Sequence, residues 1–85
     1  MPDELSTDEI AKLVDAAAEI LADSGAKMPC RELVRIAVNT GMWNKPGTPA
    51  TAMALYNAML AECREKPHPR FKICPEFRGH FEVNP

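Results

Sequence analysis

The sequence predicts a mainly α-helical domain with a small β wing, in the element order of a winged helix-turn-helix. Apolar residues recur at helical spacing over about residues 6–23, 30–39 and 48–64, and capping or helix-ending residues bound each segment. Polar and apolar residues then alternate over 70–74 and 80–83, which is typical of two strands joined by a turn. We therefore expect a three-helix bundle followed by a C-terminal β-hairpin.

The size and charge of the chain limit the classes of protein to consider. Its 85 residues suffice for one domain, which we place at residues 6–85 after a short disordered lead over residues 1–5. The net charge of −2 gives no overall positive field to attract nucleic acid. The first 40 residues nevertheless hold eight carboxylates against four cations, and the rest holds six cations against four carboxylates. A local basic edge is therefore compatible with the acidic total.

The first helix has a clear start and a clear end. Ser6 and Glu9 have the spacing of a capping box, and Ser24-Gly25 ends the helix after about Asp23. Its expected apolar face consists of Ile10, Leu13, Val14, Ala17, Ile20 and Leu21.

A short link and a second helix follow. Pro29 favours an extended Met28, which could add a one-residue bridge to a sheet. The helix is expected from about Cys30 to Asn39, with Gly41 just beyond its end. In the loop that follows, Trp43 is expected to fold back over the core. The expected buried side of this helix is Leu33, Ile36, Ala37 and Thr40, flanked by Val34 and Val38.

The third helix is the element around which the rest is arranged. Thr48 is expected as its N-cap and Pro49 as its first residue. One stripe is expected to face the core: Ala52, Leu55, Tyr56, Met59 and Cys63. The opposite face is small and mostly uncharged: Ala50, Met53, Ala54, Asn57, Ala61 and Arg64.

The C-terminal segment is expected to form the wing. Residues 75–79 would turn between the two strands. The inward side chains would be Phe71, Ile73, Phe81 and Val83, and the outward ones Arg70, Lys72, His80 and Glu82. A hairpin of this length is not stable alone, so it must pack on the helices.

Several short motifs, in this order, resemble the HARE-HTH domain family over roughly residues 10–84. They are the helix-glycine-link-helix pattern of residues 13–33, Gly41-Met42-Trp43, Thr48-Pro49, Leu55-Tyr56-Asn57-Ala58-Met59, Arg70-Phe71 and Arg78-Gly79-His80-Phe81. The resemblance implies a winged helix-turn-helix. It also implies binding to DNA, or an adaptor role in transcription or DNA modification, as in the RNA polymerase delta subunit, chromatin-associated proteins and proteins beside restriction enzymes.

Candidate DNA contacts lie at both ends of the third helix and on the wing. A helix N-terminus suits phosphate, although Thr48 would equally serve only as a cap. Asn57 could bond an adenine edge or simply be exposed, and the wing cations could follow phosphates or merely protect a sheet edge. The candidate DNA-binding residues are Lys45, Thr48, Thr51, Asn57, Arg64, Arg70, Lys72, Arg78 and His80.

No cofactor, metal or catalytic group is expected. Cys63, His68, Cys74 and His80 do not have a common zinc spacing, and no nucleophile or phosphate-loop motif occurs. Three cysteines and no apolar run of membrane-spanning length favour a cytoplasmic protein, associated with the nucleoid if bacterial.

Two functions are therefore open. The first is a winged-helix protein that binds or accompanies double-stranded DNA in transcription or chromosome handling. The alternative is a protein–protein adaptor that uses the alanine-rich face of the third helix, with RNA polymerase or another protein as its partner. The uncharged helix face and the net charge of −2 favour the alternative, whereas the wing cations and the family resemblance favour DNA.

Overall fold

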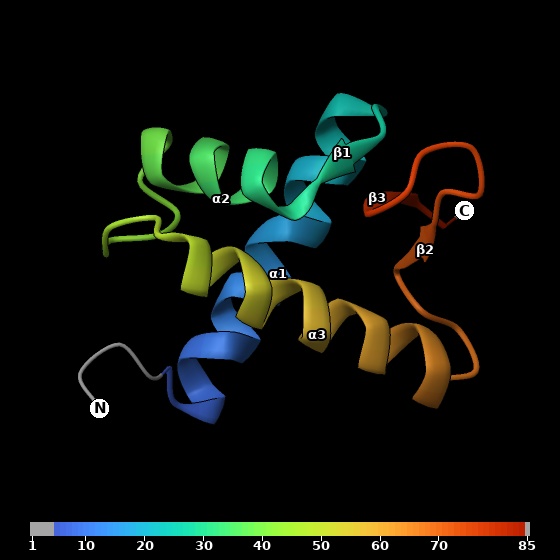
Figure 1. Cartoon of the computed structure of the whole chain (residues 1–85), viewed down its shortest axis with the longest axis horizontal. Coiled ribbons are helices and arrows are strands. Elements are labelled where there is room, and N and C mark those ends of the chain that lie inside the picture. Colours follow the sequence, from blue (N-terminus) through green and yellow to red (C-terminus); the bar gives the residue numbers. More distant parts are fainter. Residues whose placement is uncertain (1–4, 85) are drawn as a thin grey trace.

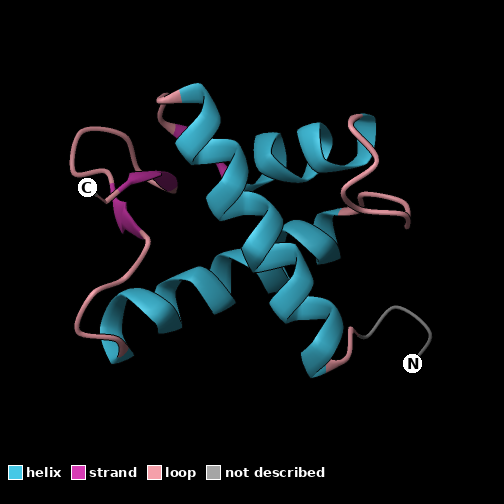
Figure 2. Cartoon of the chain, turned by 180° about the vertical axis from the view of Figure 1, so that it is seen from behind, coloured by secondary structure: helices cyan, strands magenta, loops and turns pink. Residues whose placement is uncertain are grey.

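Three helices cross one another beside a small sheet in the computed structural model, which describes residues 5–84 (Figure 1). Figure 2 shows α1 running across the back of α3. The predicted fold class, a mainly α winged helix-turn-helix, is confirmed. The elements in order are α1 (Thr7–Ser24), β1 (Met28–Pro29), α2 (Cys30–Asn39), α3 (Pro49–Glu65), β2 (Phe71–Ile73) and β3 (His80–Val83).

The sheet joins the link after α1 to the wing. All pairing is antiparallel in the order β1-β3-β2, so that β3 lies in the middle. Met28 pairs with Phe81, and the pairing continues to Pro29 opposite His80. The predicted bridge at Met28 is thus confirmed and is one residue longer than expected.

The helix starts follow the predicted capping chemistry. The Glu9 backbone N–H donates to Ser6 Oγ at 3.2 Å, and the Ser6 N–H donates to the Glu9 carboxylate at 3.0 Å. At α3, the Thr51 N–H donates to Thr48 Oγ1 at 3.2 Å, with the reciprocal bond from the Thr48 N–H at 3.4 Å. Gly25, with φ of 65°, ends α1 in the left-handed conformation that glycine adopts readily.

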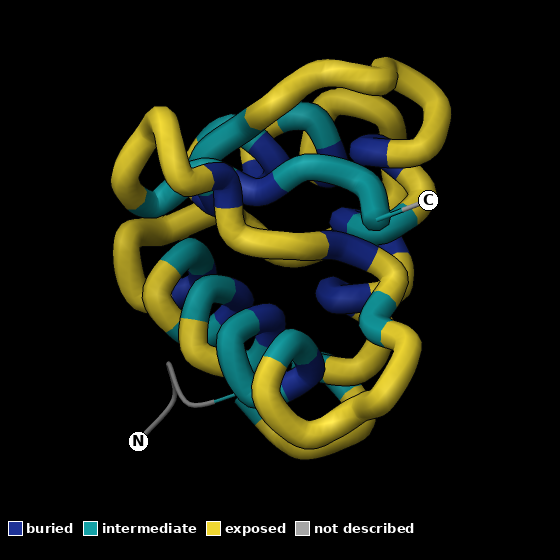
Figure 3. Tube along the Cα trace, turned by 90° about the vertical axis from the view of Figure 1, so that its right-hand side faces the viewer, coloured by how far each residue is buried: buried dark blue, intermediate teal, exposed yellow. Residues whose placement is uncertain are grey.

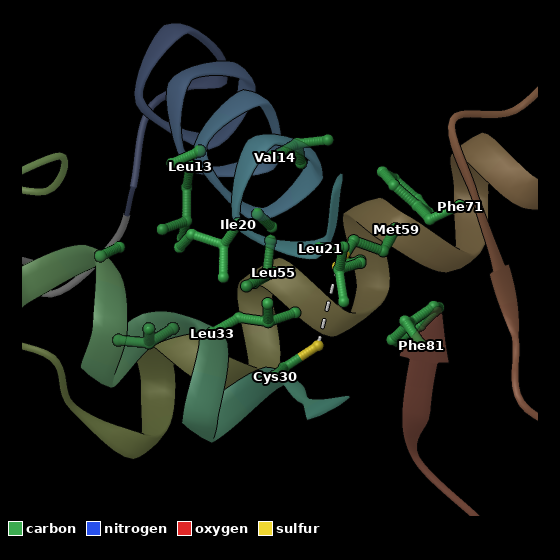
Figure 4. Packing of buried hydrophobic residues seen from close by; sticks show 14 of the residues in the cluster. Leu13, Val14, Ile20, Leu21, Cys30, Leu33, Leu55, Met59, Phe71 and Phe81 are labelled. Carbon is green, nitrogen blue, oxygen red and sulfur yellow. Dashed lines mark hydrogen bonds between the residues drawn. The ribbon is translucent and has the colours of Figure 1, made fainter. Parts of the chain in front are cut away.

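The core lies between the helices and the inner side of the wing (Figures 3 and 4). Phe71 and Phe81 are fully buried, with ring centroids 6.0 Å apart at 81°, and Tyr56 meets Phe81 edge-on at 5.8 Å. The prediction that the aromatic side of the wing faces inward is therefore confirmed. Leucines from all three helices complete the centre: Leu13, Leu21, Leu33 and Leu55.

Two details of the predicted burial are wrong. Ile73 is 48% exposed at the end of β2, which is an edge strand of the sheet. Cys74, the next residue, is buried instead. On α2, Thr40 is exposed and its hydroxyl donates to the Ile36 carbonyl oxygen at 2.8 Å, which caps the helix end rather than filling the core.

The loop before α3 is held tightly. Trp43 is 5% exposed and its backbone N–H donates to the Ala37 carbonyl oxygen at 3.0 Å, so its predicted role over the core is confirmed. A Cβ added at Gly47 would lie 2.7 Å from Val34 Cγ1, so that a side chain there would require the valine or the loop to shift. Of the predicted lead, residues 1–4 lie outside the described residues, and Leu5 is half-buried against the core.

The wing depends on its inward aromatic rings. Phe81→Ala removes a fully buried ring that contacts both Phe71 and Tyr56. We expect the free energy of unfolding, measured by urea titration, to fall by about 3 to 5 kcal/mol. The matched control is Phe77→Ala, whose ring is 51% exposed and whose loss should change stability by less than about 1 kcal/mol. Equal losses in the two variants would contradict this packing.

Candidate functional site

The helix α3 turns a different side to the core than its apolar pattern predicts. The residues that are fully buried are Thr51, Leu55, Met59 and Glu62. Ala52, Tyr56 and Cys63 of the predicted stripe are only half-buried and lie along its flank. The buried side is rotated because Thr51 and Glu62, although polar, satisfy their hydrogen bonds inside the fold.

The outward face of α3 is apolar and uncharged over most of its length. Met53 is 61% exposed near the start of this face, and Ala50 and Asn57 beside it are exposed. Ala54 and Ala61 are half-buried at the edge, and Arg64 adds the one charge of this face in the last turn. An exposed methionine surrounded by small side chains can contact an apolar partner without removing charges from water.

Open grooves border this face on both sides. One groove, of about 620 Å³, lies between α2 and α3, and its wall on α3 includes Pro49, Ala52, Met53 and Tyr56. The other has a similar volume of about 620 Å³ and lies between α3 and the start of α1, where Leu5 and Ile10 meet Ala54, Asn57 and neighbouring residues. Met53 lines both grooves and forms the ridge between them.

The groups predicted to bind phosphate at the start of α3 have partners within the fold. Lys45 forms an ion pair with Glu9, the capping residue of α1. The Thr48 and Thr51 hydroxyls lie 3.1 Å apart and cap the helix, and Thr51 is only 6% exposed. The Thr51 side chain faces inward as the second half of the cap, and its predicted contact with phosphate stays a prediction.

Arg70 is exposed, as predicted, but its guanidinium is paired and joins the wing to two helices. Its guanidinium donates from Nη2 to Glu62 Oε1 at 2.8 Å, from Nε to Glu62 Oε2 at 3.1 Å, and from Nη1 to Asp15 Oδ1 at 2.7 Å. The Arg70 backbone N–H also donates to Glu62 Oε2 at 3.1 Å. These charge-assisted bonds connect α1, α3 and the start of β2, and they use the Arg70 guanidinium within the fold.

The carboxylate of Glu62 is held in its charged form by this arrangement. Its side chain is 6% exposed, so burial alone would favour the neutral form. The hydrogen bonds from Arg70 outweigh burial and lower the pKa of Glu62 to about 2. Lys66 contributes a further ion pair, with Nζ 3.4 Å from Oε1.

The remaining wing residues divide into paired and unpaired cations. Lys72 Nζ lies 3.8 Å from the Glu82 carboxylate on the neighbouring strand. His80 Nδ1 lies 3.1 Å from the Arg78 carbonyl oxygen, and its ring faces the exposed Phe77 with centroids 5.5 Å apart. Arg78 is exposed, and within residues 5–84 no carboxylate lies within ion-pair distance of it.

The nine predicted residues do not form one cluster. Lys45, Thr48 and Thr51 lie at the start of α3, while Arg64 and the wing residues lie near or beyond its other end (Figures 1 and 2). A helix of 17 residues spans about 25 Å, so the two groups are separated by roughly that length. Asn57 stands between them on the outward face.

The three cysteines are free thiols. Cys30 and Cys74 are buried and Cys63 is half-buried. Burial raises the pKa of the Cys30 thiol to about 12, and it also raises the pKa of Cys63. Among the described residues, no three His, Cys, Asp or Glu side chains gather where they could hold a metal ion.

Sequence reasoning missed two sets of residues. Glu62 continues the spacing of Leu55 and Met59, a signal that could have placed it on the buried side despite its charge. Arg31 and Arg35, one turn apart on α2, line the groove against α3, and their spacing alone could have shown that they share a face.

Comparisons with models of known families, with curated proteins and with solved structures find no match for this chain. The resemblance to the HARE-HTH family therefore stays a prediction. Within the described part of the chain, every helix is too short or too polar to cross a membrane.

The pair of Glu62 and Arg70 gives stability a dependence on acid pH. Since the folded-state pKa of Glu62 is lowered to about 2 from an ordinary 4.5, its stabilisation is complete above pH 4.5 and is lost as the pH falls towards 2. We expect Glu62→Gln to lower the free energy of unfolding at pH 7 by about 1.5 to 3 kcal/mol.

The same variant should lose less stability than the unaltered protein between pH 5 and pH 2, measured by urea titration at each pH. Glu65→Gln, an exposed position on the same helix, is the matched control and should follow the unaltered protein. Parallel pH profiles for Glu62→Gln and the control would contradict the role of this pair.

Proposed function

We propose that this chain is a protein-interaction module built on a winged-helix scaffold, with the outward face of α3 as its contact surface. The observation that carries the proposal is Met53, which is 61% exposed on a face without charge between Pro49 and Cys63. Open grooves on both sides would let partner side chains pack around this ridge. Exposed apolar patches of this kind are typical of interaction sites.

The electrostatics support a protein partner over a nucleic acid at this face. The net charge is −2, and Lys45, Arg70 and Lys72 each lie within ion-pair distance of a carboxylate. A cation already paired in the fold gains less from a phosphate, because a favourable contact must be broken first. A neutral surface avoids that cost when it meets an apolar protein surface.

Contact with double-stranded DNA is the second candidate function, and a different region favours it. Arg64 and Arg78 are exposed, and among the described residues no carboxylate lies within ion-pair distance of either. Two such cations beside the wing suit phosphates, though only a few contacts would form. The HARE-HTH resemblance adds the expected setting, which is transcription, RNA polymerase or DNA modification.

The cytoplasm remains the proposed compartment. The three cysteines are unpaired, with two of them buried as small apolar side chains. Free buried thiols persist where the surroundings are reducing. In a bacterial cell, the second candidate function would place the protein at the nucleoid.

Photo-crosslinking in the cells that make this protein tests the interaction module. We expect a chain carrying Asn57→benzoylphenylalanine, on the outward face of α3, to give a discrete crosslinked band that resists nuclease and contains a second protein. Adding Met53→Glu should weaken the band several-fold, because a carboxylate would then be buried in the contact.

The matched control is Glu19→benzoylphenylalanine, at an exposed position of α1 away from either groove. It should give no such band. A band equally strong from both positions, or none from Asn57, would contradict the proposed contact surface.

A salt titration of duplex DNA binding tests the second candidate. If Arg64 and Arg78 contact phosphates, replacing both with alanine should reduce the slope of log affinity against log salt by about 2. Fluorescence anisotropy of a labelled duplex at about 50 mM to 200 mM salt measures the slope. Lys12→Ala, an exposed cation on α1, should leave it unchanged. Absence of binding at the lowest salt would remove this candidate.

A further inference from the structure

The groove between α2 and α3 combines an apolar floor with a cationic rim. Val34 and Val38 of α2 form one wall, and Ala52, Met53 and Tyr56 of α3 form the other. Val38 is 36% and Met53 61% exposed, so both walls offer open apolar surface. The two helices lie one above the other on the face shown in Figure 1, and their apolar walls face the space between them.

The rim on the α2 side carries two arginines. Arg31 and Arg35 are exposed, line the groove and follow one another by one helical turn. Arg35 already forms an ion pair with Glu32 at the surface, whereas no carboxylate of the described residues lies within ion-pair distance of Arg31. The positive charge of this rim is therefore only partly compensated within the chain.

We propose that this groove binds an amphipathic helix of a partner protein that carries acidic residues along one edge, an inference that rests on the proposed interaction module. Groove walls built from residues at i, i+3 or i+4 have the ridges into which a third helix packs its apolar side. Carboxylates one turn apart on that helix would meet Arg31 and Arg35, which can bind them bidentately.

The charges and burial distinguish this occupant from two others. A nucleic acid would meet the arginines with phosphate, but the valines, Ala52 and Met53 offer its backbone no polar partner. In a second copy of this chain, half of the described carboxylates lie on α1, whose Leu13 and Leu21 are 0% exposed in its own core. The α1 helix of a second copy would therefore present carboxylates to the arginines, but no leucine side chains to pack into the groove.

The groove is also held in shape before any partner arrives. The close approach of Gly47 to Val34, together with the buried Trp43, fixes the loop at the end of α2 against the helices. The Thr48 cap fixes the first turn of α3, which forms the same end of the groove. A preformed groove loses little conformational freedom on binding, which favours affinity.

Selection from a library of displayed helical peptides, with the whole chain as bait, tests this inference. We expect enriched peptides to carry two carboxylates one turn apart and apolar residues at i, i+3 or i+4, and i+7 on the neighbouring face. Fluorescence anisotropy of a labelled enriched peptide should show at least a tenfold loss of affinity for the double variant Arg31→Glu, Arg35→Glu. The milder Arg31→Gln, Arg35→Gln should lose at least threefold if charge reversal disturbs folding.

The control Lys12→Glu reverses an exposed cation of α1 that lines neither groove, and it should keep affinity within twofold. A different outcome would overturn this inference and leave the interaction module in place. In that outcome, Met53→Lys or Asn57→Arg abolishes binding of the enriched peptides, whereas the Glu and Gln variants of Arg31 and Arg35 bind them unchanged. The inference would also be overturned if basic peptides or no peptides were enriched, or if duplex DNA displaced the peptide. A concentration-dependent dimer in sedimentation that blocks peptide binding would overturn it as well. The crosslinking from Asn57 decides separately whether the interaction module itself is correct.

Discussion

The contact between Glu62 and Arg70 fixes how the wing meets the helices. A carboxylate that is almost entirely removed from water is stable as a charge only with strong hydrogen bonds, and Arg70 supplies them from its side chain and its backbone. Because Arg70 precedes Phe71 directly, the same contact aims that ring into the core. Asp15 extends it to α1, so one guanidinium sets the position of β2 relative to two helices.

The pairing of Arg70 with Glu62 also limits which cations of the wing are available to bind a partner. Arg70 pairs with Glu62 and Asp15, and Lys72 lies near Glu82. Among the described residues, Arg78 is therefore the wing arginine without a carboxylate at ion-pair distance. The uncharged surface that borders both grooves is the outward face of α3 and not the wing. A helix that is apolar on its outer as well as its inner side is unusual for an isolated domain, since the outer side contributes nothing to the core.

Local chemistry made much of the fold predictable. The caps Ser6 and Thr48, and the glycine at 25, mark helix ends through bonds within a few residues, so the helix bounds could be read directly. Burial depended on distant partners and was harder. Ile73 alternates correctly but lies on an edge strand, and nothing in the pattern shows which strand is at the edge.

The candidate site was less predictable than the fold for a related reason. Residue types correctly predicted an exposed Arg70 but not its pairing with the buried Glu62 of α3, which lies eight residues earlier in the chain. The groove between α2 and α3 depends on how the two helices pack against each other, and the apolar period of each helix does not predict that packing. Asn57 was correctly placed on the outward face because that required only the period of one helix.

The central position of β3 has a consequence for how the protein is made. The strand β1 finds its only partner about 50 residues later in the chain, a long closure that is entropically costly and slow to form. During synthesis, the three helices are made before β3, so the apolar surface that meets Phe71 and Phe81 has no cover while the wing is incomplete. Any helical segment that has left the ribosome keeps this surface accessible to chaperones and proteases until Val83 has emerged as well.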